Sequence, residues 1–409
     1  MQSCKAKEII ISKLVQKNHQ PTTINQQPST INHQPKMTLS YWEIKSWFTN
    51  IDFTIVGSGI VGLSCALRLK DQFPKANILI LEKGMLPQGA STKNAGFACF
   101  GSLSEILDDL KSHSEEEVFN LVKKRVNGLQ LLKETLGERA INYQNYGGYE
   151  LFLNDDDLFE ACLSKQVDIN RLLQPIFKKD VFSMKPNSFH FKKVKEHYIF
   201  NPFEGQIDTG KMMEALLQKA QSKGIKILNN ITVEGFSEAV DSVKIKTNSV
   251  EFSTSKLCIA TNGFATQLIK EDVKPARAQV LITKPIDNLH IKGTFHLDKG
   301  FYYFRNIDNR ILLGGGRNLD FKGEETTDFA QTYIIQNKLE SILKTVILPE
   351  IPFEIEQRWS GIMGVGKLKN TIVKSLGNHV YCGVKLGGMG IAIGSLVGKE
   401  LAQLIAYHD

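Results

Sequence analysis

Several features that would assign a chain to a specific class are missing from this sequence of 409 residues. Its six cysteines include no C-x-x-C pair, and no two of its nine histidines have the spacing i, i+4. The sequence therefore predicts neither a disulfide framework nor a metal site. No run of 18 or more apolar residues is present, and the N-terminus has no apolar signal-peptide core. We expect no transmembrane segment, and we expect a location in the reducing cytoplasm.

The positive charge of the chain is concentrated near its start. The formal net charge is +7, of which residues 1–36 carry +4, so that only +3 remains for the rest. Because this excess is small, we expect no nucleic-acid partner. Residues 18–36 form a polar tract of Gln, Asn, Thr and Pro, which predicts a disordered tail over residues 1–36. Met37 opens a sequence of globular character and is our hypothesis for the translation start.

The stretch DFTIVGSGIVG, residues 52–62, has the pattern of a strand, a phosphate-binding turn and a helix. Gly57 permits the tight turn, Gly59 removes a Cβ that would block a pyrophosphate, and Gly62 lets the helix pack closely on the sheet. The helix N-terminus would offer free N–H groups and a partial positive charge to the phosphates. Glu82 ends a second predicted strand, 20 residues after the last glycine, where a carboxylate suits a ribose diol. The combination predicts dinucleotide binding; the alternative is a βαβ unit whose glycines serve packing alone.

Small residues also follow later predicted strands. GASTKNAGFACFG, residues 89–101, can lie close to a bulky planar ligand and donate backbone hydrogen bonds to it, or can form an ordinary surface loop. A short strand at 257–260 ends at Thr261 and Gly263, and ligands of open α/β sheets bind at such carboxyl ends. The last strand, 380–386, runs into glycines at 387–390 before a final helix to about residue 406.

Periodicity predicts the remaining elements. Residues 115–136 have the spacing of an amphipathic helix, which packs on the protein or lies at a membrane surface. Residues 141–204 are aromatic and irregular, which suits a lid or a substrate-domain sheet. Other predicted segments are helices at 210–223 and 328–347, a strand at 225–228, an antiparallel meander over 231–257, strand-like runs within 277–316, and a glycine turn at 358–366.

Four motifs together resemble the FAD-dependent oxidoreductases of the D-amino acid oxidase and glycine oxidase type, over roughly residues 52–408. The motifs are IVGSGIVGLSCALRL with LEK, GASTKNAG, CIATNG, and RWSG with VKLGGMGIAIGSLVGKELAQLI. The resemblance implies FAD bound without a covalent bond, because neither Cys99 nor Cys382 matches the cysteine of flavinylated members. For the glycines before the last helix, a bulge that serves packing is the alternative. The residues implied in FAD binding are Gly57, Gly59, Ile60, Gly62, Glu82, Lys83, Ser91, Thr92, Asn94, Gly96, Val233, Thr261, Gly263, Gly387, Gly388, Met389 and Gly390.

The resemblance also implies the reaction. FAD takes a hydride equivalent from a carbon that bears an amine, water hydrolyses the imine, and oxygen or a quinone reoxidises the flavin. We nominate no side-chain base. Amino acid oxidases of the family often carry an arginine after the Trp-Gly turn, and its absence from residues 359–364 argues against simple D-amino acids. GFYYFRNIDNRILLGGG resembles the gamma-glutamylputrescine oxidase branch, which makes Tyr302, Tyr303 and Arg305 substrate candidates; the alternative is a strand with alternating faces.

We therefore predict an α/β protein with a Rossmann-like FAD-binding domain interleaved with a mixed antiparallel-sheet substrate domain. The FAD-binding domain is expected at 50–110, 205–275 and 355–409, and the substrate domain at 111–204 and 276–354. The predicted function is oxidation of a C–N bond of an amine or amino acid. Two alternatives stay open: a tRNA-modifying flavoenzyme that acts on an aminomethyl uridine, and a flavin-binding protein without catalysis.

Overall fold

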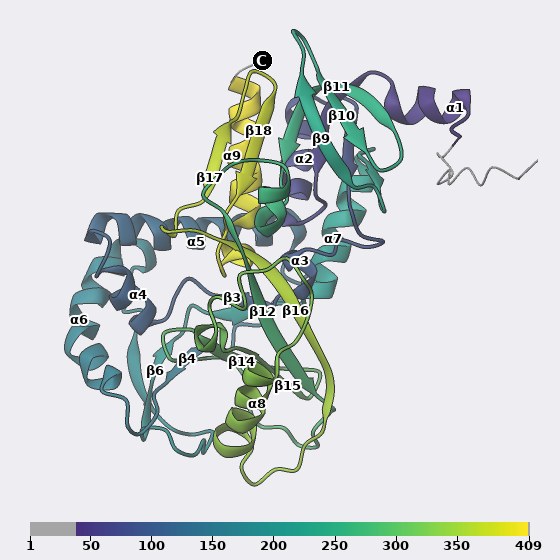
Figure 1. Cartoon of the computed structure of the whole chain (residues 1–409). Helices are drawn as coiled ribbons and strands as arrows, with labels where there is room; N and C mark the ends of the chain where they lie inside the picture. Colours follow the sequence, from purple (N-terminus) through teal and green to yellow (C-terminus); the bar gives the residue numbers. More distant parts are fainter. Residues whose placement is uncertain (1–37, 408–409) are drawn as a thin grey trace, which may run out of the picture. The chain divides into compact units, whose positions relative to one another are not determined.

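The computed structural model describes residues 38–407, and the predicted disordered tail with Met37 lies outside the described residues. Two eight-stranded sheets form the framework of the described chain (Figure 1). The first is parallel at its centre, and the second is mostly antiparallel, which confirms the predicted fold class. No helix within residues 38–407 is long and apolar enough to cross a membrane.

The first sheet carries the predicted strand, turn and helix at its centre. Its order is β17-β18-β11-β1-β2-β8, and all neighbours are parallel except β17 and β18. The central strands are buried on both faces, which explains their nearly continuous apolar sequence. The bounds are β1 (Ile51–Val56), β2 (Ile78–Leu81), β8 (Lys226–Leu228), β11 (Glu251–Ile259), β17 (Ile372–Ser375) and β18 (Val380–Val384). A ribbon of β9 (Val233–Glu238) and β10 (Val243–Thr247) continues from β11.

Helices α2 (Ile60–Gln72), α7 (Thr209–Ser222) and α9 (Gly390–Tyr407) pack on this sheet, and α5 (Glu115–Leu136) packs on α9. Helices α2 and α9 lie side by side (Figure 1). Glycine permits this approach, because a Cβ on Gly398 would lie 2.6 Å from the carbonyl oxygen of Val61. Likewise a Cβ on Gly128 of α5 would lie 2.2 Å from the carbonyl oxygen of Ala392. Helix α5 is therefore packed inside the protein, as one of the two interpretations predicted.

The second sheet has the order β16-β12-β15-β14-β13-β4-β6-β5. One face packs on α8 (Tyr333–Ile342) and the π-helical turn that follows it, Leu343–Ile347. The sheet's bounds are β4 (Gly148–Leu151), β5 (Ser183–Pro186), β6 (His197–Asn201), β12 (Lys274–Thr283), β13 (Thr294–Leu297), β14 (Tyr302–Ile307), β15 (Arg310–Gly315) and β16 (Ile355–Val365).

The remaining elements are two helices beside the second sheet and several short segments. Helices α4 (Leu103–Asp109) and α6 (Leu158–Phe177) share an apolar cluster beside β4 and β6. The loop after β2 contains α3 (Ala90–Lys93) and β3 (Phe97–Ala98), which pairs with β7 (Gly205–Gln206). The other short elements are α1 (Tyr41–Glu43), the π-helical turn Ile44–Phe48, and the 3-10 turns Asn262–Gln267 and Arg317–Leu319.

Several predicted elements differ from the structure. The segment predicted as a glycine turn at 358–366 is the long strand β16, which pairs with β12 in the second sheet. Residues 355–365 were expected in the FAD-binding domain, but they are not part of the first sheet. Its glycines serve close approach, because a Cβ on Gly364 would lie 2.6 Å from the side-chain oxygen of Asn262. The third strand of the predicted meander and the strand at 257–260 are one strand, β11. The helix predicted at 328–347 begins only at Tyr333, and α6 lies within the segment that periodicity left irregular.

Candidate active site

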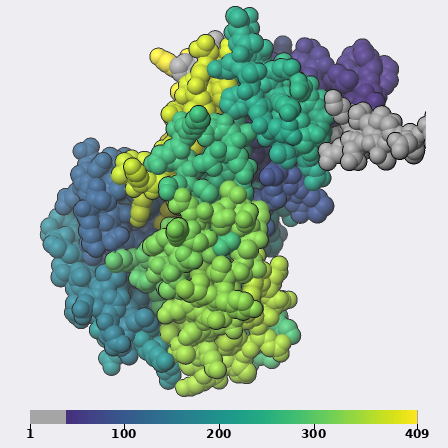
Figure 2. Space-filling view, in the orientation of Figure 1, coloured from purple at the N-terminus to yellow at the C-terminus, as the bar shows by residue number. Residues whose placement is uncertain are grey.

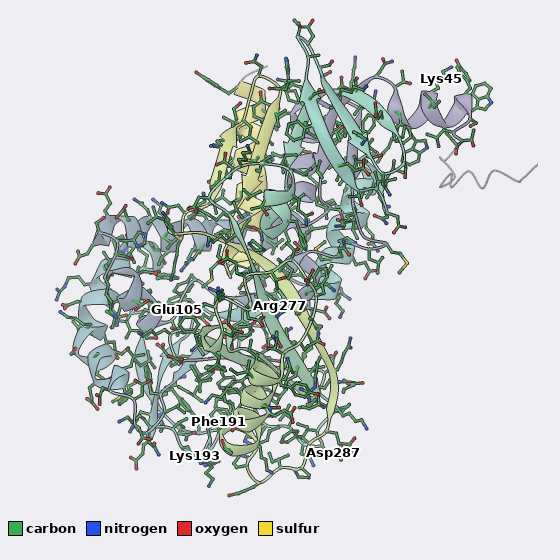
Figure 3. The ribbon with its side chains drawn as sticks, in the orientation of Figure 1. Lys45, Glu105, Phe191, Lys193, Arg277 and Asp287 are labelled. Carbon is green, nitrogen blue, oxygen red and sulfur yellow. The ribbon has the colours of Figure 1, made fainter. Side chains whose placement is uncertain are left out.

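A cavity of ≈ 570 Å³ lies between the carboxyl ends of the parallel strands and one face of the second sheet. Its walls come from β1, β2, the residues just after β11, the loop after β2, the turn before α9, and strands β12 to β16. Glu105 of α4 also lines it; Figure 3 labels this residue and Arg277 of β12. In Figure 2 the yellow chain near residue 370 lies against the blue segment that carries α4, in agreement with an ion pair between Lys369 and Asp109. The position at strand ends is the usual one for ligands of open α/β sheets.

The predicted phosphate turn forms one end of the cavity. Gly57 has φ +104°, and a Cβ there would lie 2.8 Å from the carbonyl oxygen of Ala260. Gly59 is the N-cap of α2 and supplies no side-chain cap, so the helix N-terminus is open to an anion. The amide of Ile60 donates to Ser91 Oγ at 3.0 Å, and both residues line the cavity. Gly62 does not line it; a Cβ there would lie 2.0 Å from the carbonyl oxygen of Gly57.

Glu82 lies at the end of β2, buried, on the cavity wall next to Lys83 and Val233. Its Oε2 accepts from the amide and the hydroxyl of Ser58 at 3.1 and 2.7 Å, and its Oε1 accepts from the amide of Gly84 at 3.0 Å. These donors fix the carboxylate at the place where a ribose diol is expected. The hydroxyl of Ser58 is one of these donors, which explains why a serine follows Gly57.

Of the residues predicted in the loop after β2, Ser91, Asn94 and Gly96 line the cavity. Asn94 holds this loop: its Oδ1 accepts from the amide of Gly96 at 2.8 Å, and its Nδ2 donates to the carbonyl oxygen of Ser91 at 2.8 Å. Thr92 does not line the cavity, because its hydroxyl donates to the carbonyl oxygen of Pro87 at 2.6 Å. Its role is to shape the loop.

The glycines before α9 form the opposite wall. The cavity is lined there by Gly387, Gly388, Met389 and Gly390, and the 18-residue helix α9 begins at the last of these. Cβ atoms at Gly387 and Gly390 would have no neighbour within 4 Å, so packing does not explain glycine at these two positions. Gly263 differs: it does not line the cavity, and a Cβ there would lie 2.5 Å from the carbonyl oxygen of Met363.

A family model described as FAD dependent oxidoreductase matches residues 52–404. The chain belongs to this family. The probable oxidoreductase OrdL of Haemophilus influenzae is 21% identical over 386 residues, which cover 88% of this chain and 83% of that protein. L-2-hydroxyglutarate dehydrogenase of Escherichia coli is 23% identical over 343 residues, with 79% and 75% covered. The structure of L-proline dehydrogenase from P. horikoshii has a TM-score of 0.69 at 20% identity, with 88% and 94% covered, which shows a shared fold.

The cavity fits FAD. Anion, ribose and ring contacts are available from the N-terminus of α2, the held carboxylate of Glu82, and the unfilled space at Gly387 and Gly390. The hydroxyl of Thr261, buried on the cavity wall, has no hydrogen-bond partner among residues 38–407. Cys99 also lines the cavity, and burial raises the pKa of its thiol well above the usual range. A protonated thiol is a poor nucleophile, in keeping with FAD held without a covalent bond.

One row of residues across the second sheet faces the cavity from the substrate side. In register order it contains Glu150 of β4, His296 of β13, Tyr303 of β14, Gly314 of β15 and Val280 of β12. Cross-strand partners project from the same face of a sheet. Three of these residues, His296, Tyr303 and Val280, line the cavity.

Of the three predicted substrate residues, only Tyr303 lines the cavity. Tyr302 points to the opposite face, into the apolar core under α8. Arg305 shares the face of Tyr303 but is buried, and its guanidinium donates to the carbonyl oxygens of Ala95 and Ile207. Arg305 therefore ties the second sheet to the loop after β2 and to the residue after β7, and it does not line the cavity. The alternating faces proposed from the sequence explain all three positions.

His296 and Glu204 form a buried pair at this wall that sequence reasoning missed. Nε2 of His296 lies 2.9 Å from Oε2 of Glu204, which also accepts from the hydroxyl of Thr294 at 3.1 Å. Burial lowers the pKa of His296, but the charge and hydrogen bond of Glu204 outweigh burial and raise it to about 9. The imidazole is therefore charged at neutral pH.

Two arginines on the cavity wall lack a carboxylate partner within residues 38–407. Arg317, half-buried after β15, donates no hydrogen bond there, and its guanidinium lies over the ring of Phe321 at 4.7 Å. Burial lowers its pKa, partly offset by the charge of Glu324. Arg125 of α5 is buried, donates from Nη1 to the carbonyl oxygen of Phe100 at 2.8 Å, and leaves Nε without a partner. The cavity thus contains cations that protein carboxylates do not neutralise.

Within residues 38–407 no cluster of histidine, cysteine and acidic side chains could hold a metal ion. Arg317 was detectable in the sequence, because it directly follows the glycine run GGG that ends a predicted strand. No local pattern marks Glu204 as the partner of His296.

Proposed function

We propose that this FAD-dependent oxidoreductase oxidises the C–N bond of a small amino acid or amine, and that an amino acid is the preferred class. The observation that carries the proposal is Arg317, a half-buried cation on the cavity wall without a carboxylate partner in the described chain. A guanidinium binds a carboxylate through two parallel hydrogen bonds, which fixes the orientation of the bound molecule. Arg317 supplies the cation that is missing from residues 359–364. The argument against amino acids that was based on this missing arginine therefore no longer holds.

When bound, FAD supplies the hydride acceptor. The residues of this chain hold the substrate and exclude water. Arg317 binds the carboxylate, the ring of Tyr303 covers the substrate from the second sheet, and Phe97 supports that ring edge-on at 5.5 Å. Loss of a hydride from carbon and a proton from nitrogen leaves an imine, which water converts to a carbonyl compound and either ammonia, from a primary amine, or an amine, from a secondary one. Oxygen or a quinone is the proposed acceptor of the two electrons.

Oxidation of a 2-hydroxy acid is a second candidate, because L-2-hydroxyglutarate dehydrogenase of Escherichia coli is among the relatives. An alcohol must give up its hydroxyl proton together with the hydride, so it needs a base, whereas a neutral amine can use its lone pair. Two of the titratable groups on the substrate wall are poor bases at neutral pH. Glu204 raises the pKa of His296 to about 9, and burial raises the pKa of Tyr303 to about 12. Because these two groups are poor bases, the site favours oxidation of a C–N bond over oxidation of an alcohol.

Anaerobic titration of the purified holoprotein tests the proposal. The panel contains D- and L-amino acids, N-methylated amino acids, amines without a carboxylate, and 2-hydroxy acids, and flavin absorbance is recorded. We expect bleaching by at least one amino acid. Arg317→Gln should weaken binding of that amino acid roughly tenfold or more, whereas Arg310→Gln, which removes an arginine paired with Glu356 outside the cavity, should not. Bleaching by hydroxy acids alone, or by no compound, would overturn the proposal.

A further inference from the structure

The buried pair of His296 and Glu204 has a geometry that packing alone does not require. Both side chains are more than nine-tenths buried, and their contact joins β13 to the turn between β6 and β7. Every polar atom of the Glu204 carboxylate is used: Oε1 accepts from Asn201 at 3.3 Å, and Oε2 accepts from Thr294 and the imidazole. A buried ion pair is often no more stable than apolar residues of the same size. Because His296 lines the cavity, we infer that the ion pair has a chemical role.

The surroundings of His296 are unusually acidic. Besides Glu204, its register partner on β4 is Glu150, which is buried and accepts from Ser102 and Ser104. Glu105 of α4 and Glu150 add to the effect of Glu204 on the pKa of the imidazole. Two other titratable groups of the cavity wall, Tyr303 of β14 and Cys99 beyond β3, have raised pKa values and stay neutral. Among His296, Tyr303 and Cys99, the imidazole is therefore the group that carries a positive charge at neutral pH.

The second nitrogen of the ring is available. Nε2 is engaged by Glu204, while Nδ1 has no hydrogen-bond partner among the described residues. Phe97 lies edge-on to the imidazole at 5.3 Å and to Tyr303 at 5.5 Å, so one aromatic ring fixes both side chains. Because His296 is buried on the protein side and lines the cavity, Nδ1–H is the donor that it can offer to a bound molecule.

We propose that His296 contacts the substrate and donates a hydrogen bond from Nδ1 to a carboxylate oxygen, with Glu204 as the residue that positions and charges the imidazole. The inference rests on the proposed function, and it assigns the substrate carboxylate a second ligand besides Arg317. An imidazolium at this place also disfavours an ammonium group nearby, so it selects the neutral amine that can transfer a hydride. No proton leaves His296 in the binding step.

The test measures binding of benzoate, acetate and anthranilate to the oxidised holoprotein by perturbation of the flavin spectrum between pH 6 and 10. Wild-type affinity should fall by up to about tenfold as pH rises through the pKa of His296, which is about 9, and should then level off. His296→Gln should bind these carboxylates roughly tenfold more weakly at pH 7, and it should lose this pH dependence. Any decline caused by lysines or by the flavin itself would persist in His296→Gln, so the difference between the two curves isolates the imidazole.

Glu204→Gln supplies the second variant, since it keeps shape and hydrogen-bonding capacity but removes the charge. The midpoint of carboxylate binding should move at least one pH unit lower, and affinity should recover on acidification. His290→Gln, which changes an exposed histidine of the loop before β13, is the matched control and should leave both curves unchanged. FAD content, measured for every variant, separates loss of the cofactor from loss of carboxylate binding.

Each negative outcome of these experiments would overturn a different claim. If His296→Gln kept the affinity and pH dependence of the wild-type protein, the inference would be overturned, and the proposed oxidation of an amino acid would still stand. A flavin that amines reduce, in a protein that binds no carboxylate, would overturn the inference and leave only amine oxidation. Carboxylate binding that follows the His296 and Glu204 variants, in a protein that no amine or amino acid reduces, would support the inference and overturn the proposed function.

Discussion

Arg305 on β14 donates through Nε to the carbonyl oxygen of Ala95, and this contact ties the second sheet to the loop that borders the FAD cavity. Nη2 of the same side chain donates to the carbonyl oxygen of Ile207 at 3.0 Å. Burial lowers the pKa of Arg305 to about 10, so it stays charged at neutral pH. The guanidinium thus holds β14 against the loop after β2 and the segment after β7.

The first prediction follows from this contact. Arg305→Met should leave two buried carbonyl oxygens without donors, at about 1–3 kcal/mol each. We expect a lower free energy of unfolding and weaker FAD binding, measured by urea denaturation and by equilibrium dialysis. Arg310→Met changes an arginine of the next strand, whose ion pair with Glu356 is partly exposed, and should cost less than about 1 kcal/mol. Equal effects of the two variants would contradict the structural role of Arg305.

The second prediction separates two glycines of one motif. Gly59→Val places a side chain at the cavity, where the nearest atom is the flexible Ser91 hydroxyl at 2.8 Å, so the protein should fold without FAD. Gly62→Val meets the carbonyl oxygen of Gly57 at 2.0 Å and should fail to fold. Gly235→Ala, with no atom within 4 Å, is the control and should change neither property. Absorbance at 450 nm and circular dichroism distinguish the outcomes; a yellow Gly59→Val protein would refute the phosphate turn.

The FAD end of the cavity could be predicted from the sequence, and the substrate end could not. Phosphate and ribose contacts come from backbone groups and a carboxylate within one βαβ unit, so residues such as Gly59 and Glu82 are marked by local spacing. His296 and Glu204 lie 92 residues apart and meet through the order of β13, β4 and β6. Local spacing contains no information about that order.

The predicted turn at 358–366 failed for a related reason. Glycine permits turns, but it also permits close approach of one chain to another, and the sequence does not distinguish the two uses. In β16, Gly361 faces Lys93, and Gly364 faces Asn262. The family resemblance points to a substrate arginine only in this segment. Arg317 comes from the end of β15, which β12 separates from β16 in the sheet.

The third prediction uses two neighbouring glutamates with different burial. Glu324 is fully buried and receives two hydrogen bonds of 2.8 Å from Arg277 of β12, beside the cavity wall. Glu324→Gln leaves a buried guanidinium without its countercharge and should lower the free energy of unfolding by about 3–5 kcal/mol. Glu325 pairs with Lys274 at the surface, and Glu325→Gln should change it by less than about 1 kcal/mol. Urea denaturation of both variants checks the difference; similar losses would mean that Arg277 finds another acceptor.

The fourth prediction concerns stability and pH. The pKa of His296 is raised from 6.5 to about 9 in the folded protein, because the charge of Glu204 outweighs burial. Its stabilising contribution is therefore complete below pH 6.5 and is lost as pH rises toward 9. Wild-type protein should lose more stability between pH 6 and 9 than His296→Gln, in which no imidazole titrates at this wall. Glu204→Gln should be less stable than wild type at pH 6 and should also show the smaller loss.

Urea denaturation at a series of pH values measures the slopes, and His290→Gln corrects for a surface histidine. Identical slopes in wild type and His296→Gln would show that Glu204 does not hold the proton on the imidazole, and the proposed charge at the substrate wall would be absent.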